Sequence, residues 1–205
     1  LRFASALTHE QDAVTAARLV AQAAQASLGS GQVDLAFLFF SSHYADQADL
    51  LASVVRDTLS PRVLTGCSGE GVIAESQEIE GQPAIALWAA CLPGVRIEPI
   101  RPTFIHEHAS EPPSGEVRSS VMGWPDGLES AGSLPVFLVL ADPFSTPVDE
   151  LLALLADRYP GAPVIGGLAG GGHDLGDNRL VDAGRLGGGC EASPLRLAAA
   201  LLLGE

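Results

Sequence analysis

The hydrophobic positions along the chain predict strands that alternate with amphipathic helices. Residues 34–40 form a nearly continuous apolar run, which is typical of a strand covered on both faces. Residues 46–59 carry their apolar side chains on one helical stripe, and Pro61 ends this predicted helix. A new strand begins at residues 63–64. This succession of strand, helix and strand favours an α/β fold.

The flanking segments extend the same pattern. After a strand at residues 3–7, Thr8 and Gln11 have the spacing of a capping box that would begin an alanine-rich helix reaching about Leu28. Thr146 and Pro147 are expected to begin another helix, as N-cap and first helical residue. Further strands are predicted at residues 72–74, 84–91, 95–100, 135–141, 162–166, 179–181 and 195–203.

The chain also repeats itself at an offset of 100 to 101 residues. We therefore predict one domain over residues 1–205, built from duplicated β-α-β-β halves at residues 34–100 and 135–204. Mixed sheets with helices packed outside would form a layered sandwich. Residues 104–134 are rich in Gly, Pro and Ser and are expected to be a variable connection, with a short helix at residues 117–122.

Each repeat ends its second strand in a glycine-rich turn, at residues 66–71 and 166–172. Such turns let backbone N–H groups converge on a small anion or carboxylate, and ligands of open α/β sheets bind at the carboxyl ends of strands. The turns and the polar ends of the preceding strands would thus form two walls of one site. The candidate ligand-binding residues are Ser41, Ser42, Gly66, Cys67, Ser68, Gly69, Glu70, Gly166, Gly167, Ala169, Gly170 and Arg179.

Several other interpretations of these residues stay open. Arg179 would pair either with a ligand carboxylate or with a surface acid. Cys67 is either a nucleophile, with His43 or His173 as its base, or a buried apolar side chain. Residues 69–74 match a dinucleotide-binding pattern on paper, but that pattern must open a helix and here a strand follows. The sequence therefore predicts no cofactor, and no catalytic or metal-binding residue is assigned.

Composition narrows the classes of partner and the cellular location. The net charge of −14 disfavours nucleic acids and anionic membranes. All eleven basic residues are arginines, so Schiff-base chemistry and a phosphate-loop lysine are excluded. Three cysteines are too few for a disulfide framework, and no apolar run approaches the roughly 18 residues of a membrane helix. A cytoplasmic protein is expected.

Three segments together resemble a known family. Residues 39–42, the turn Leu64-Thr65-Gly66-Cys67-Ser68-Gly69-Glu70-Gly71 and residues 164–170 are similar to the N-terminal part of FIST domains, and the resemblance spans about Ala4 to Gly204. FIST domains are sensory modules of bacterial signal-transduction proteins and also occur in some F-box proteins. Leu168 stands where the family often has serine, which implies that the second turn contributes backbone contacts.

The resemblance implies a sensory domain that binds a small ligand, such as an amino acid or another small polar metabolite. It also implies as partners a C-terminal FIST domain or a signalling output domain beyond this chain. Two alternatives remain: a hydrolase or transferase that uses Cys67 or Ser68, and a protein-interaction scaffold without a ligand. Enzyme activity is the less favoured reading, since no partner base is evident from the sequence.

Overall fold

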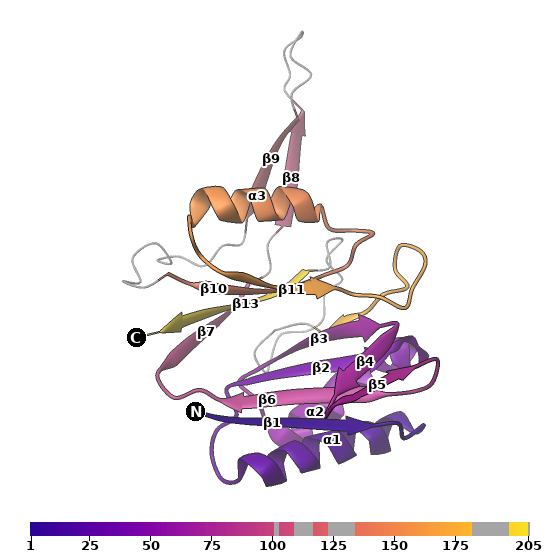
Figure 1. Ribbon diagram of the computed structural model, residues 1–205. Coiled ribbons are helices and arrows are strands. Elements are labelled where there is room, and N and C mark those ends of the chain that lie inside the picture. Colours follow the sequence, from indigo (N-terminus) through magenta and orange to yellow (C-terminus); the bar gives the residue numbers. More distant parts are fainter. Residues whose placement is uncertain (101–102, 109–116, 123–133, 182–196, 205) are drawn as a thin grey trace.

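Two β-sheets face each other in the middle of the molecule, and helices cover their outer faces (Figure 1). The structure is a computed structural model, and it describes residues 1–100, 103–108, 117–122, 134–181 and 197–204. Strands pair in both parallel and antiparallel directions within each sheet. The predicted α/β class, with mixed sheets and outer helices, is therefore confirmed.

The first sheet has the order β1-β6-β2-β3-β12. Its central strand, β2, pairs in parallel with β3 and antiparallel with β6. Helices α1 and α2 cover one face of this sheet (Figure 1). The elements are β1 (Arg2–Thr8), α1 (Ala13–Leu28), β2 (Leu35–Ser41), a 3-10 helix (Ser42–Gln47), α2 (Ala48–Leu59), β3 (Val63–Gly69), β6 (Ile85–Cys91) and β12 (Leu180–Val181).

The second sheet has the order β11-β10-β13-β7, and α3 covers its outer face (Figure 1). Two hairpins complete the described fold: β4 pairs with β5, and β8 pairs with β9. The elements are β4 (Gly71–Ala74), β5 (Gln77–Glu80), β7 (Val95–Ile100), β8 (Thr103–His108), β9 (Val117–Met122), β10 (Val136–Ala141), α3 (Val148–Arg158), β11 (Val164–Leu168) and β13 (Leu197–Gly204).

The two sheets share one pattern of strand pairing. In β1-β6-β2-β3 and in β7-β13-β10-β11 the first two neighbouring pairs are antiparallel and the third is parallel. A helix joins the parallel strands in both cases, α2 in the first sheet and α3 in the second. Internal duplication would produce this likeness and remains our prediction for its origin. The second half also contributes a strand to the first sheet, because β12 follows β11 in the chain but pairs with β3.

The faces of β2 explain how the layers hold together. Ala36, Leu38 and Phe40 are buried in the cluster formed with α1 and α2. Phe37 and Phe39 point the other way, toward the second sheet, and are half-buried. A continuous apolar strand is stable here because helices cover one face and the second sheet faces the other. Alanines on α1 let this helix approach the sheet closely.

A glycine lies at the same place in each parallel strand pair. Gly66 is opposite Leu38 in register, and Gly166 is opposite Val139. A Cβ atom added at Gly66 would collide with the carbonyl oxygen of Leu38, and one at Gly166 would collide with that of Val139. Both positions therefore require glycine for close backbone approach.

Three local expectations were wrong. The N-cap of α1 is Asp12, whose carboxylate accepts a hydrogen bond from the Thr15 N–H (2.9 Å), whereas Thr8 stays in β1 opposite Ile85. Residues 117–122 form strand β9 rather than a helix, because pairing with β8 satisfies their backbone. The N-cap of α3 is Pro147, one residue later than expected, and makes no side-chain capping bond. The rest of the connection over residues 104–134 lies largely outside the described residues.

We predict that Gly66→Ala and Gly166→Ala each lower the free energy of unfolding by about 2–3 kcal/mol, because the new methyl group overlaps a neighbouring strand's carbonyl oxygen. In a domain of this size the melting temperature should fall by roughly 4–12 °C. Thermal denaturation followed by circular dichroism measures this. Gly167→Ala is the matched control, since a Cβ there meets no atom within 4 Å and stability should hardly change. Equal effects at Gly166 and Gly167 would refute the steric argument.

Candidate functional site

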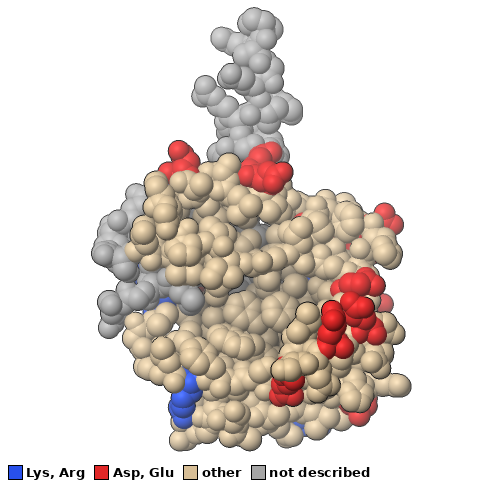
Figure 2. Space-filling view, viewed as in Figure 1, with Lys and Arg blue, Asp and Glu red and all other residues tan. Residues whose placement is uncertain are grey.

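The two sheets do not close completely on each other. Between them lies a cleft of about 670 Å³, visible as a hollow in the middle of the space-filling view (Figure 2). The first sheet contributes residues of β1, β2, β3 and β6, the second contributes residues of β10 and β11, and β4 lies along one side. This volume falls within the range of about 300–1,000 Å³ that is usual for small-molecule pockets.

Aromatic rings cover the first sheet's side of the cleft. Phe37 and Phe39 are two residues apart on β2, so both rings project from the same face, with centroids 6.0 Å apart and planes 8° from parallel. Trp88 lies opposite Phe37 in register, with 5.8 Å between the ring centroids. Phe3 extends this surface from the edge strand, 5.7 Å from Trp88. The half-buried aromatic rings leave part of their surface open to a ligand.

The second sheet's side of the cleft combines aliphatic side chains with glycine. Leu138 and Leu140 project from β10, and Ile165 lies opposite Leu138 in register. Gly167 lies opposite Leu140 and has no side chain. No other atom lies within 4 Å of the position that its Cβ would take, so this space stays empty. The glycine thus leaves room in the cleft.

The two glycine-rich segments contact each other at one end of the cleft, but the turns begin later than the sequence predicts. Residues 66–69 belong to β3 and residues 166–168 to β11, because their backbones pair with the neighbouring strands. The Gly170 N–H donates a hydrogen bond to the Ser68 carbonyl oxygen (3.0 Å). Ala169 packs against Cys67, and Gly171 lies so close to Ser42 that a Cβ atom there would be 2.8 Å from the Cβ of Ser42. The turns therefore close this end by direct contact with each other.

The candidate residues divide into those that line the cleft and those that build its closed end. Gly69 lines the cleft beside the turn, whereas Glu70 is exposed to solvent. Ser41 is buried, and its hydroxyl accepts a hydrogen bond from the Ala84 N–H (3.0 Å). The candidates that line the cleft are Cys67, Ser68, Gly69, Gly166 and Gly167.

Ser68 and Arg179 are engaged with each other's segments. The Arg179 N–H donates to the Ser68 hydroxyl (3.0 Å), and the Ser68 N–H donates to the Arg179 carbonyl oxygen (2.9 Å). The Arg179 guanidinium donates to the carbonyl oxygens of the loop before it, including that of Gly176, and lies 3.4 Å from the Asp46 carboxylate. Of the two interpretations of Arg179, these contacts fit the surface ion pair.

A buried polar network supports the second turn, and the sequence did not identify it as a unit. The Asn178 amide nitrogen donates to Asp142 (3.0 Å), and its amide oxygen accepts from the Gly172 N–H (3.0 Å). The Ser145 hydroxyl donates to the other Asp142 oxygen (2.6 Å). Asp142 and Asn178 are both buried. Asp142 directly follows the apolar residues 136–141, but nothing in the sequence pairs it with a residue 36 positions away.

Cys67 lines the cleft as a neutral thiol. Burial raises its pKa to about 12, because a thiolate would lose its hydration in this position. A nucleophilic cysteine needs the opposite shift, which a neighbouring cation or a helix N-terminus provides. The environment of Cys67 therefore fits an apolar wall and disfavours the nucleophile interpretation.

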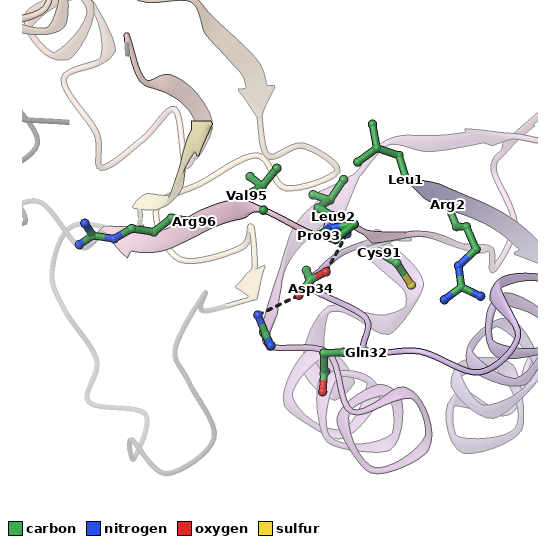
Figure 3. A pocket seen from close by; sticks show the side chains of 11 residues that line it. Leu1, Arg2, Gln32, Asp34, Cys91, Leu92, Pro93, Val95 and Arg96 are labelled. Carbon is green, nitrogen blue, oxygen red and sulfur yellow. Dashed lines mark hydrogen bonds and ion pairs between the residues drawn. The ribbon is translucent and has the colours of Figure 1, made fainter. Parts of the chain in front are cut away.

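A second cavity, of about 520 Å³, lies where the chain passes from β6 to β7 (Figure 3). It is near the amino ends of β2 and β3, opposite the glycine turns. Its charges are already engaged: Asp34 lies 3.1 Å from Arg62 and accepts the Leu92 N–H (2.7 Å), and Arg2 donates to the carbonyl oxygens of Leu28 and Ser30. We therefore regard the inter-sheet cleft as the better candidate site.

The fold and the cleft together define a layered α/β domain with a ligand-sized space between two sheets. Residues 34–192 match the FIST N domain, and the chain belongs to the FIST family. This membership indicates a sensory domain of signal-transduction proteins. Among the described residues, no helix is long and apolar enough to cross a membrane.

Mycobacterial proteins are similar to this chain. The chain is 29% identical over 186 residues to the uncharacterized protein Rv0628c of Mycobacterium tuberculosis. The matched region covers 88% of this chain and 44% of that protein. The chain is 28% identical over 169 residues to the uncharacterized protein Mb0898c of Mycobacterium bovis, covering 82% and 40% respectively. The chain thus spans less than half the length of these relatives.

We predict that Asn178→Ala lowers the free energy of unfolding by about 1–3 kcal/mol, because it removes a donor to buried Asp142 and the acceptor of the Gly172 N–H. Hydrogen exchange at the Gly172 amide should accelerate in the same variant. Asp177→Asn is the control from the same loop, since Asp177 is exposed and an amide oxygen can still accept the nearby backbone N–H groups. Unchanged exchange at Gly172 would contradict this role for Asn178.

We predict that iodoacetamide labels Cys67 about a thousandfold more slowly than an unfolded cysteine at about pH 8, because a pKa near 12 leaves very little thiolate. Peptide mass spectrometry follows Cys67 separately from the other cysteines, and labelling in denaturant is the control. Because the folded pKa exceeds the unfolded value of about 8.5, the neutral thiol contributes stability below that pH and loses it as pH rises toward 12. Rapid labelling of the folded protein would revive the nucleophile interpretation.

Proposed function

We propose that this chain is a ligand-binding sensory domain whose ligand occupies the cleft between the two sheets. The observation that carries the proposal is the cleft of about 670 Å³, which is open between the sheets and closed at one end by both glycine turns. A ligand there would touch β2, β3 and β6 of one sheet and β10 and β11 of the other. Binding would therefore be sensitive to the relative position of the two halves.

The arrangement provides a physical route from binding to signal. Few described segments join the sheets, namely the turn at residues 92–94 and the segment from β11 to β12. A ligand that contacts both sheets binds more tightly when they are close, and this difference in affinity is what shifts a conformational equilibrium. A C-terminal FIST domain or another output domain would respond to that shift, in a protein that we expect to be cytoplasmic.

The family resemblance favours amino acids or similar small polar metabolites as ligands. The residues that line the cleft include Cys67, Gly69 and Ser5 at the edge strand, whose thiol, backbone and hydroxyl are polar groups that such a ligand would use. Of the remaining candidates, Ser42 contacts Gly171 at the closed end, and Ser41 accepts the Ala84 N–H just before β6. The twelve candidate residues thus remain our proposal for the site and its support.

One observation favours a protein-interaction scaffold as a second function. β11 is an edge strand of the second sheet in the described part of the chain, and its Ile165 and Leu168 are 59% and 54% exposed. An edge strand with exposed apolar residues is a surface on which another polypeptide pairs. The enzyme alternative has less support, since the Cys67 thiol is neutral and the Ser68 hydroxyl already accepts a backbone hydrogen bond.

We expect a screen of small metabolites, covering amino acids and uncharged compounds, to yield a ligand that raises the melting temperature. At about one hundred times Kd the ligand adds roughly 2.7 kcal/mol, or about 5–10 °C in a domain of this size. Differential scanning fluorimetry measures the shift, and a ligand added to the heat-unfolded protein is the control for nonspecific effects. A complete absence of stabilising compounds, together with binding of a partner polypeptide at β11, would favour the scaffold.

A further inference from the structure

Building on the proposed sensory function, we propose that the inter-sheet cleft takes an uncharged, flat aromatic small molecule rather than a free amino acid. The cleft presents stacked rings on one side and a glycine gap on the other, and its described walls carry no ionised side chain. These features concern the chemistry of the ligand, which family membership leaves open.

The aromatic side of the cleft favours a flat apolar ligand. Phe37, Phe39 and Trp88 form one continuous aromatic surface, with neighbouring ring centroids 5.8 and 6.0 Å apart. Aromatic pairs gain about 0.5–1.5 kcal/mol beyond the burial of their area when they stack with an offset or meet edge to face. A ligand ring placed over Phe37 or Trp88 would obtain this gain and bury apolar surface of the protein as well.

The opposite side supplies the space that such a ring needs. Facing sheets pack about 10 Å apart when side chains from both fill the gap. Here Gly167 carries no side chain, and its Cβ position has no neighbour within 4 Å. The room in front of Gly167 therefore suits a planar group lying between the sheets.

Charge argues against a zwitterion in the cleft. A free amino acid brings an ammonium and a carboxylate, and burying an ion without a partner costs several kcal/mol. Arg179, which follows the second glycine turn, donates to loop carbonyl oxygens and pairs with Asp46, and it does not line the cleft. The Cys67 thiol remains protonated at neutral pH and so provides no counter-charge for the ammonium.

The rim of the cleft disfavours anions in addition. The β4–β5 hairpin borders the cleft and carries exposed Glu75, Glu78 and Glu80, and Figure 2 shows acidic side chains gathered on this side of the molecule. With a net charge of −14 for the chain, this field repels an approaching carboxylate. An uncharged ligand neither buries an unpaired ion nor is repelled by the acidic rim. The Ser5 hydroxyl at the edge strand offers it one neutral hydrogen bond.

Trp88 makes the cleft directly observable. The chain has two tryptophans, and Trp124→Phe leaves Trp88 as the single tryptophan, whose fluorescence can be followed separately from that of the two tyrosines. Four nitroaromatic quenchers of similar shape test the charge preference: para-nitrobenzyl alcohol, para-nitrobenzylamine, para-nitrobenzoate and para-nitrophenylalanine. We expect saturable quenching of Trp88 by the alcohol, with a Kd at least about tenfold lower than for the anion and the zwitterion.

A graded series at Gly167 tests the location of binding. Gly167→Leu should fill the gap and weaken binding of the alcohol by at least about tenfold, whereas Gly167→Ala should weaken it much less. Both variants should keep their melting temperature, because the added atoms enter open space. Any quenching that persists unchanged in Gly167→Leu reflects collisions or light absorption outside the cleft and would overturn the assignment.

The outcomes separate this inference from the proposed function. If amino acids raise the melting temperature and para-nitrophenylalanine binds more tightly than the alcohol, the sensory function stands and the ligand class proposed here is wrong. Preferential binding of para-nitrobenzylamine would likewise overturn the inference, in favour of a cationic ligand attracted by the acidic rim. If no quencher saturates and no metabolite stabilises the protein, both proposals fail.

Discussion

The need to cover both faces of strand β2 governs this structure. Its side chains are apolar on both faces, so the strand is stable only between two layers. Helices α1 and α2 supply the first layer and bury Leu38 and Phe40. The second sheet supplies the other layer, but it covers Phe37 and Phe39 only in part. The incomplete cover is the origin of the cleft.

The glycine turns determine how closely the two sheets approach. Gly66 and Gly166 allow the parallel strands to lie against carbonyl oxygens of their neighbours, and the Gly170 N–H after β11 donates a hydrogen bond to the Ser68 carbonyl oxygen near the end of β3. One end of the space between the sheets is therefore closed by backbone contacts. Beyond this contact the sheets separate, and Gly167 adds nothing to fill the gap. Glycine near the ends of β3 and β11 thus allows close backbone contact at one end of the cleft, and at Gly167 it leaves space open.

Much of the fold was predictable because its signals are local. Apolar runs and amphipathic stripes predict most strands and the helices, and the repeated turns predict that two strand ends meet. Local signals failed where tertiary pairing competes with them. Thr8 has the spacing of a helix cap but pairs in β1 opposite Ile85, and residues 117–122 pair with β8 instead of forming a helix. Arg179 follows a glycine turn, but its guanidinium binds loop carbonyl oxygens.

The sequence by itself determined the α/β class, the family and the presence of two glycine-rich segments, because these follow from periodicity and short motifs, although residues 66–69 and 166–168 belong to strands rather than to turns. Only the tertiary structure decided which side chains line the cleft. The aromatic character of the cleft depends on which faces of β2 and β6 are turned toward the second sheet, and strand alternation alone cannot say which face meets which layer. The separation between the sheets likewise results from packing between residues more than one hundred positions apart, such as Cys67 and Ala169.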